Sequence, residues 1–267
     1  MTDWAPANKF AILNTKNRAV FPATDLHSNL SFQIYGDDLQ YVEIDLDPEK
    51  SVIAEPGSMI YKDNPVILEA MLGGNKNKGF FGRIMGAGKR VLSGERAFLS
   101  VFTNTSPRST AKVAFAAPYP GKIIPVSLDS LGGELICQKY SFLCAEAHID
   151  IGIYFQRKIL TALFGGAGFI MQRLTGNGVV FINAGGSIAE IDLADGETIQ
   201  TDVGCLVALE PSVYFDIEGT GSLKSQFFGG SGVFFATLRG PGKVWIQSLP
   251  FIRLVQKFVS RITIKQK

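Results

Sequence analysis

The chain has 267 residues and a formal net charge of +2, from 26 Lys and Arg against 24 Asp and Glu. A charge so close to zero gives no reason to expect nucleic acid or another polyanion as a partner. The 29 glycines, 12 prolines and 20 phenylalanines predict many turns and bulky core residues, which favours an all-β protein over a helical one.

The N-terminal segment, residues 1–29, starts with Met-Thr-Asp-Trp-Ala-Pro and has an early acid but no apolar core. It therefore has the features of neither a secretory signal nor an Arg-rich transit peptide. The three cysteines, Cys137, Cys144 and Cys205, leave one thiol unpaired in any disulfide scheme and fit a reducing compartment. We expect a cytoplasmic protein.

The first clear element lies at 42–47, where every second residue is apolar. Val42, Ile44 and Leu46 fall on one face of an extended strand, and three carboxylates fall on the other. This alternation predicts a half-buried β-strand whose acids, Glu43 among them, lie on the exposed face. The same sequence, Glu-Ile-Asp-Leu, returns at 190–193.

A longer pattern occurs three times along the chain. Its copies begin at residues 55, 138 and 202, and each leads 27 residues later to a glycine behind an aromatic residue. Offsets of 83 and 147 residues superimpose the copies, and a second glycine follows 11 or 12 residues after the first. These glycines are the predicted anchors of a structural repeat: Gly82, Gly165 and Gly229, then Gly94, Gly176 and Gly240.

The repeat divides the chain into three β-modules, at 30–120, 121–186 and 187–250, flanked by an N-terminal segment, 1–29, that packs on the first module and a C-terminal segment, 251–267. Modules of this size are marginally stable alone, because a short chain buries only part of its apolar surface. No low-complexity linker separates them. We therefore predict three tandem β-sandwich modules that form one compact body, with a short C-terminal helix.

A basic, glycine-rich stretch between Lys76 and Arg96 contains six basic residues and one acid. Lys89 and Arg90 follow Gly-Arg-Ile-Met-Gly-Ala-Gly, which resembles a phosphate-binding loop but has five residues between its outer glycines where four are needed. A solvated loop that faces the acidic strands of a neighbouring module or subunit is favoured, because the stretch falls within the repeat. The alternative is a surface that contacts phosphate groups or a membrane through Lys89 and Arg90.

The sequence shows no constellation of catalytic residues. The two histidines, His27 and His148, stand in no grouping that would bind a metal ion. Ser58, Ser141 and Cys205 share one position of the repeat, but no base lies beside them, which favours small-residue packing over nucleophilic catalysis. We predict that the protein is not an enzyme and uses no cofactor or metal ion.

The periodicity of residues 156–163 fits a short helix or a strand and does not decide between them. From 251 to 262 the apolar residues follow a helical spacing, with cationic residues on the opposite side: Arg253, Lys257 and Arg261. Such a helix either docks on its own protein or rests on an anionic membrane. Docking is favoured because the helix follows the last predicted strand directly, after Pro250.

Several motifs together resemble a known family: Glu55-Pro-Gly-Ser-Met, Gly79-Phe-Phe-Gly-Arg, the strand after Gly94, and Gly240-Pro-Gly-Lys-Val-Trp-Ile-Gln-Ser-Leu-Pro. They are similar to the "altered inheritance of mitochondria" family of mitochondrial biogenesis proteins and its bacterial relatives. The resemblance implies a triplicated TRAP-like fold, a short relative of the double-stranded β-helix, and a homotrimer whose nine modules close a ring. Bacterial members have no established activity, and eukaryotic members are associated with mitochondrial inner-membrane organisation.

Two classes of function are compatible with these observations. The first is a non-enzymatic, ring-shaped, homo-oligomeric scaffold or interaction protein, for which peripheral membrane contact through the C-terminal helix is one mode of action. The alternative is a small-molecule binding module with sites between adjacent β-modules. The RNA-binding ring protein of this fold uses basic residues that have no matching motif here, so no nucleic acid partner is expected.

Overall fold

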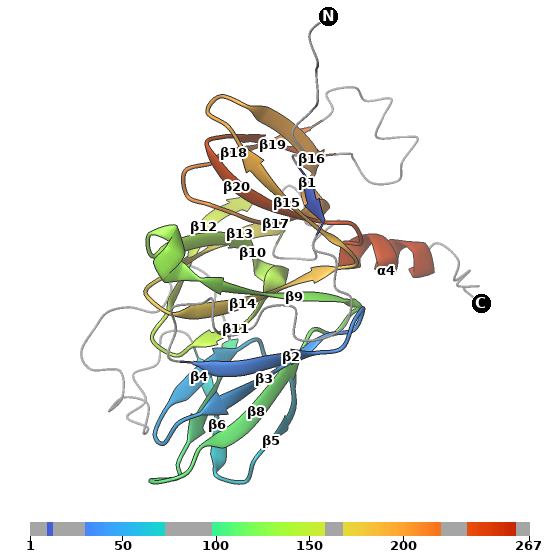
Figure 1. Cartoon of the computed structure of the whole chain (residues 1–267). Coiled ribbons are helices and arrows are strands. Elements are labelled where there is room, and N and C mark those ends of the chain that lie inside the picture. The colour runs from blue at the N-terminus through green and yellow to red at the C-terminus, as the bar shows by residue number, and fades with distance from the viewer. Residues whose placement is uncertain (1–9, 13–29, 73–97, 158–167, 220–233, 260–267) are drawn as a thin grey trace, which may run out of the picture. The chain divides into compact units, whose positions relative to one another are not determined.

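The computed structural model describes residues 10–12, 30–72, 98–157, 168–219 and 234–259 (Figure 1). Within these ranges the chain forms β-strands, short 3-10 helices and one α-helix, α4 (Phe251–Val259). The predicted all-β fold with a short C-terminal helix is therefore confirmed. No helix in the described ranges is both long enough and apolar enough to cross a membrane.

Contacts between residues divide the chain into two compact units. The N-terminal unit comprises residues 15–156 and 170–183, and the C-terminal unit comprises residues 1–14, 157–169 and 184–267. The predicted first module lies in the N-terminal unit and the third in the C-terminal unit, whereas the middle one contributes to both. The division into three modules stays a prediction.

The N-terminal unit contains a four-stranded and a six-stranded antiparallel sheet. The four-stranded sheet has the order β2 (Ser31–Tyr35), β3 (Tyr41–Leu46), β8 (Ala111–Ala116), β5 (Met59–Lys62). The six-stranded sheet has the order β6 (Val66–Leu72), β7 (Phe98–Asn104), β4 (Ser51–Ala54), β11 (Phe142–Glu146), β14 (Val179–Gly185), β9 (Gly121–Ser127). Three more strands belong to a different sheet and are hydrogen-bonded to one another in the order β10 (Glu134–Gln138), β13 (Phe169–Thr175), β12 (Asp150–Arg157). Gln156 and Arg157, whose conformation the sequence left open, thus end a strand.

Apolar side chains from these two sheets form the core of the N-terminal unit. Val42, Ile44 and Leu46 of β3 are fully buried, as their alternation with acids predicts. Phe32 of β2 meets Phe181 of β14 edge to face, with ring centroids 4.8 Å apart. The core therefore faces inward from β2, β3 and β8, and their polar side chains lie on the outer face of the four-stranded sheet.

The C-terminal unit contains four neighbouring strands of one sheet and a separate three-stranded sheet. The four strands are hydrogen-bonded in the order β1 (Phe10–Ile12), β15 (Ile188–Leu193), β20 (Gly242–Gln247), β17 (Leu206–Leu209). The three-stranded sheet has the order β16 (Thr198–Asp202), β19 (Phe234–Arg239), β18 (Tyr214–Gly219). β1 pairs with β15, in the predicted third module. The prediction that residues 1–29 pack on the first module is thus wrong for the described part of that segment.

The first turn of α4 contacts its own unit. The Arg253 guanidinium lies 3.3 Å from Asp202 Oδ2 and donates to Cys205 Sγ at 3.5 Å. A Cβ atom on Gly204 would lie 3.6 Å from Ile252, so the helix passes directly over that glycine. Docking is observed at this end, while Phe251 and Phe258 are exposed. Contact of this helix with a membrane stays a prediction.

One strand-pairing scheme recurs three times along the chain, in β3 to β8, β9 to β14 and β15 to β20. In each set of six consecutive strands, the sixth lies between the first and third, and the fifth lies between the second and fourth. The third strand carries a β-bulge at the same place each time, between Met59 and Tyr61, Phe142 and Cys144, and Leu206 and Ala208. Strands can therefore be matched by their position in the scheme.

The scheme corrects one predicted repeat position. Gly176 N donates to Gly133 O at 3.0 Å, and Gly240 N donates to Glu197 O at 2.9 Å. The corresponding bond in the first set runs from Asn104 N to Lys50 O at 3.0 Å. Asn104 therefore corresponds to Gly176 and Gly240, and Gly94, which lies outside the described residues, does not. The strand after Gly94, β7, pairs with β4 and β6, as β19 pairs with β16 and β18.

Candidate functional site

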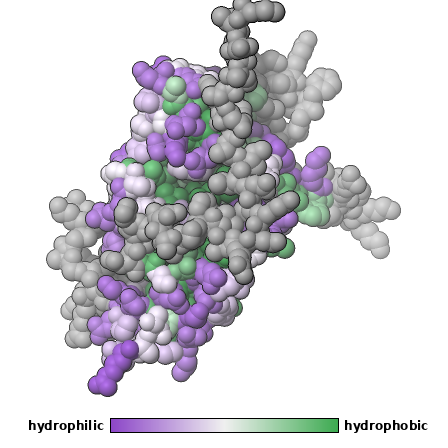
Figure 2. All heavy atoms as spheres, in the orientation of Figure 1, coloured by the Kyte–Doolittle hydropathy of each residue, from purple (hydrophilic) through white to green (hydrophobic). Residues whose placement is uncertain are grey.

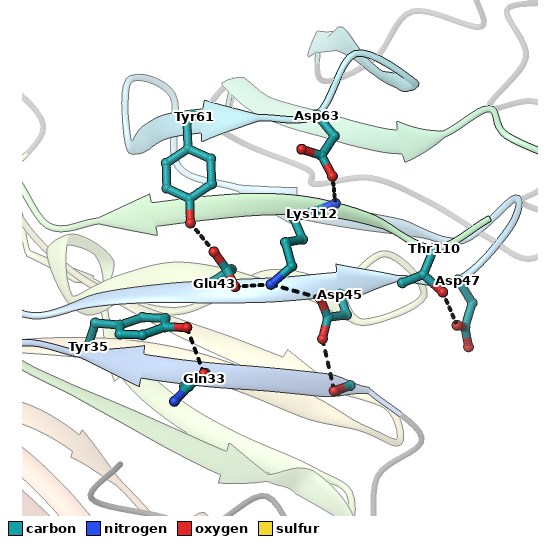
Figure 3. Close-up of polar contacts among 10 residues, drawn as sticks. Gln33, Tyr35, Glu43, Asp45, Asp47, Tyr61, Asp63, Thr110 and Lys112 are labelled. Carbon is teal, nitrogen blue, oxygen red and sulfur yellow. Dashed lines mark hydrogen bonds and ion pairs between the residues drawn. The ribbon is translucent and has the colours of Figure 1, made fainter. Parts of the chain in front are cut away.

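A cluster of polar side chains covers the outer face of the four-stranded sheet (Figure 3). At its centre, Glu43 accepts hydrogen bonds from the Lys112 ammonium and the Tyr61 hydroxyl. Lys112 Nζ also lies 3.7 Å from Asp45 Oδ1. Asp63 Oδ2 accepts the backbone N–H of Lys112 at 2.8 Å. Three strands, β3, β8 and β5, therefore meet at one carboxylate.

Strand register explains why these side chains meet. Asp45 lies opposite Lys112, and Glu43 lies opposite Ala114, so the long Lys112 side chain reaches both acids from the neighbouring strand. Tyr61 also lies opposite Ala114, on the other side of β8. The small Ala114 side chain leaves room for Tyr61 to reach across β8 to Glu43.

The electrostatics of the cluster keep Glu43 ionised. Hydrogen bonds from Lys112 and Tyr61 hold the pKa of Glu43 below its usual value of 4.5. The hydrogen bond from Tyr61 to Glu43 raises the pKa of Tyr61 to about 12, and the hydrogen bond from Lys112 to Glu43 raises the pKa of Lys112. A carboxylate with a lowered pKa is a weak proton acceptor, so this arrangement favours an ion pair that fixes strands over a general base.

The sequence predicted that Glu43 lies on the exposed face of its strand. The face is correct, but only 11% of the Glu43 side chain is exposed, because Tyr61 and Lys112 cover it. Sequence reasoning missed both partners. A signal was present: Lys112-Val-Ala-Phe115 matches Lys243-Val-Trp-Ile246, and both segments begin the sixth strand of their sets.

A related ion pair occurs in the C-terminal unit. Lys243 Nζ lies 2.8 Å from Glu190 Oε1, and the Trp245 indole donates to Glu190 Oε2 at 2.9 Å. Glu190 raises the pKa of Lys243. Because Glu190 and Lys243 hold the same places in their set as Glu43 and Lys112, the pair belongs to the repeated architecture. Within the described ranges, no group of three His, Cys, Asp or Glu side chains is placed to hold a metal ion.

A second feature of the site is a strand edge that has no neighbour among the described strands. β11 lies between β14 and β4, whereas β5, the corresponding strand of the first set, ends its sheet at β8. Likewise β4 lies between β7 and β11, whereas β16, its counterpart in the third set, ends its sheet at β19. We call β4 and β11 the joined edges. β5 and β16, each with one neighbour among the described strands, are the free edges.

Burial differs sharply between corresponding residues at these edges. At the joined edges Ala54 and Cys144 have no exposed surface. On β5, Ile60 is 49% exposed and Tyr61 is 40% exposed. In Figure 2 the lower part of the picture, where β3, β5, β6 and β8 are labelled in Figure 1, is mainly purple and white. The free edge β5 is thus exposed at Ile60 and at Tyr61, which belongs to the Glu43 cluster.

Among the residues that the structure describes, those singled out from the sequence are not brought together. Gly176 and Gly240 lie in separate turns, and a Cβ atom on Gly240 would be 2.3 Å from Ala194 O, a distance that no side chain tolerates. Arg253 pairs with Asp202, and Lys257 is exposed on α4. The other predicted residues lie outside the described ranges: Gly82, Gly94, Gly165, Gly229, Lys89, Arg90 and Arg261.

Comparison with known proteins places the chain in a family. The profile of the family described as "Mitochondrial biogenesis AIM24" matches residues 32–249. The chain belongs to this family. It is 34% identical over 210 residues to the uncharacterized protein M6_Spy0233 of Streptococcus pyogenes serotype M6, covering 78% of this chain and 81% of that protein. The crystal structure of protein SPYM3_0169 from Streptococcus pyogenes is similar, with a TM-score of 0.68 and 27% identity over 88% of this chain and 100% of that one.

Proposed function

We propose that this AIM24 family member is a non-enzymatic scaffold that assembles with copies of itself, through the free edges β5 and β16, into a ring-shaped homotrimer. The observation that carries the proposal is the position of these strands in the repeated scheme. β5 takes the place of β11 and β16 takes the place of β4, and β4 pairs with β11 within one chain. Each copy therefore has one edge that matches the other edge of the next copy.

Physical chemistry supports self-association at such edges. The unpaired N–H and C=O groups of a free edge are a template for another strand. β5 and β16 differ in sequence, so a contact between them is head-to-tail. Head-to-tail contacts either close into a ring or continue as a filament. Closure with three copies, as the resemblance to the ring-forming family implies, leaves neither strand uncovered.

Native mass spectrometry of the purified protein tests the proposal. We expect a species with three times the 28.9 kDa mass of one chain. No cofactor or metal ion is required for this role, so the mass should be that of the polypeptide alone. A monomer at micromolar concentration would contradict the proposal.

A proline in β16 is expected to prevent assembly while the single chain still folds. In an antiparallel ladder every second residue forms its backbone hydrogen bonds with the neighbouring strand. Because Gly240 N donates to Glu197 O, the backbones of Ile199 and Thr201 bond to β19. The backbone N–H and C=O groups of Gln200 therefore point toward the free edge. Gln200→Pro thus removes one outward N–H group, which an edge strand tolerates. We expect this variant to be a folded monomer and its control, Gln200→Ala, to remain a trimer. A Gln200→Pro trimer would rule out β16 as the contact.

A further inference from the structure

The pairing of the joined edges is fully defined within one chain. Ala54 lies opposite Cys144, Ile53 opposite Ala145, and Val52 opposite Glu146. Two backbone bonds flank these pairs, from Glu55 N to Leu143 O at 2.9 Å and from Ala147 N to Ser51 O at 3.2 Å. Hydrogen-bonded and non-hydrogen-bonded pairs therefore alternate along this ladder. Ala54–Cys144 and Val52–Glu146 are the pairs without direct backbone hydrogen bonds between them.

This register can be transferred to the free edges by structure. The β-bulge lies between Phe142 and Cys144 in β11 and between Met59 and Tyr61 in β5, so Tyr61 corresponds to Cys144. In the other strand, Ser51 pairs with Thr103 and Thr198 pairs with Arg239, each one residue from the recurring bond between the fifth and second strands. Ser51 thus corresponds to Thr198, and Ala54 corresponds to Thr201.

We infer that β16 of one copy pairs antiparallel with β5 of the next in a single register, with Thr201 opposite the partner's Tyr61 and Gln200 opposite the partner's Lys62. The inference rests on the proposed function and adds the contact surface and its alignment. It also places Ile199 opposite the partner's Asp63. This register sets no like charges directly opposite one another across the two strands.

The register also determines which face the next copy covers. Ala54 and Cys144 both belong to the buried core of the N-terminal unit, where the β2, β3 and β8 side chains lie over them. By correspondence, Thr201 and the partner's Tyr61 lie on one face of the shared sheet. Tyr61 contacts Glu43 on that face, so the Glu43–Lys112 cluster borders the interface. A slip of one residue would turn the opposite face of β16 toward the cluster.

Cysteine pairs measure the register directly. Opposed residues of an antiparallel ladder are about 4.5 to 5.5 Å apart at Cα, within disulfide range, whereas diagonal residues are about 7 to 8 Å apart. We expect Thr201→Cys with Tyr61→Cys in one chain to form inter-chain disulfides under oxidised glutathione. Ile199→Cys with Tyr61→Cys is the matched diagonal control, and we expect on the order of tenfold less linked product from it. The unsubstituted chain controls for the buried native thiols Cys137, Cys144 and Cys205.

A second in-register pair of cysteines leaves Tyr61 and its hydroxyl group unchanged. Gln200→Cys with Lys62→Cys replaces two side chains that are exposed in the single chain, and we expect it to link as well. Linked dimers and trimers from both in-register pairs, but not from the diagonal control, support the inference. Efficient linkage of the diagonal pair, or of no pair in a protein of trimeric mass, overturns the register and leaves the proposed function standing. A monomeric mass overturns both.

Discussion

The joined edges and the free edges have one backbone arrangement but different side chains. β4 reads Ser-Val-Ile-Ala and β11 reads Phe-Leu-Cys-Ala-Glu, and their central residues are buried. β16 reads Thr-Ile-Gln-Thr-Asp and β5 reads Met-Ile-Tyr-Lys, and much of their surface is exposed. The joined edges are covered by protein in the folded chain, whereas the free edges are partly exposed and carry polar side chains. The difference indicates that side-chain polarity, and not backbone geometry, distinguishes a joined edge from a free one.

The largest expected effect comes from placing proline at corresponding positions of the two edges. Ile53 is almost fully buried in β4, and its counterpart in β16 is Gln200. Ile53→Pro removes a ladder hydrogen bond to β11 and a core side chain, which together cost on the order of 4 kcal/mol or more. Gln200→Pro should lower the unfolding free energy of one chain by about 1 kcal/mol or less.

Thermal unfolding followed by circular dichroism compares the two prolines. We expect Ile53→Pro to be unfolded or to melt far below the parent chain, and the Gln200→Pro monomer to melt cooperatively. Equal losses in the two variants would show that both edges are internal joints.

An intermediate effect is expected from alanine at corresponding apolar residues. Leu143 of β11 is buried, and its counterpart in β5 is Ile60. Leu143→Ala should destabilise the chain by about 2 to 5 kcal/mol, through lost burial and the cavity left behind. Ile60→Ala in the Gln200→Pro background should change stability by roughly 0.5 kcal/mol or less, because the residue is exposed there.

The Ile60 substitution also sharpens the comparison in the assembled protein. If the next copy covers β5, Ile60→Ala should dissociate the trimer at a higher protein concentration than in the parent, as native mass spectrometry across a dilution series will show. An unchanged dissociation midpoint would place Ile60 outside the contact.

Local sequence patterns predicted the elements that depend on local chemistry. Alternation at 42–47 predicted β3, and helical spacing after Pro250 predicted α4. The offset of 147 residues, which aligned residues 55 and 202, also matches Ser51 to Thr198, because β4 and β16 lead to β5 and β17 through short connections of similar length. The Gly94 position failed because residues 73–97 separate β6 from β7, a longer connection than those after β12 and β18. Spacing alone cannot locate an insertion.

The polar cluster could be predicted only in part. Glu43 stood out because its tetrapeptide recurs at Glu190. Lys112 is 69 residues from Glu43, and their contact depends on the β3–β8 register, which no local pattern contains. The free edges could not be predicted from local sequence patterns either. An edge is defined by the absence of a neighbouring strand, which depends on the order of the whole sheet.

The smallest expected effect concerns the charge of the cluster beside the free edge. The pKa of Glu43 is lower in the folded chain than its usual value of 4.5, so the unfolded chain binds the proton more readily in acid. The stabilisation by Glu43 is therefore complete above pH 4.5 and is lost as the pH falls through the folded pKa. Glu43→Gln should lower Tm by about 2 °C or less at pH 7, as for a partly exposed ion pair.

Melting curves of the parent and Glu43→Gln between pH 3 and pH 7 test this sign, with Glu190→Gln as the matched variant away from the free edges. We expect the Tm difference for Glu43→Gln to be constant above about pH 5 and to shrink toward zero in acid, because protonation removes the charge from the parent as well. A Tm difference that persists at pH 3 would mean that shape, and not charge, stabilises the cluster.

If the next copy covers this face, the Tm difference should be larger in the trimer than in the Gln200→Pro monomer, since an ion pair shielded from water is screened less by salt. Equal differences in trimer and monomer would place the cluster outside the contact and would limit the interface to the two paired strands.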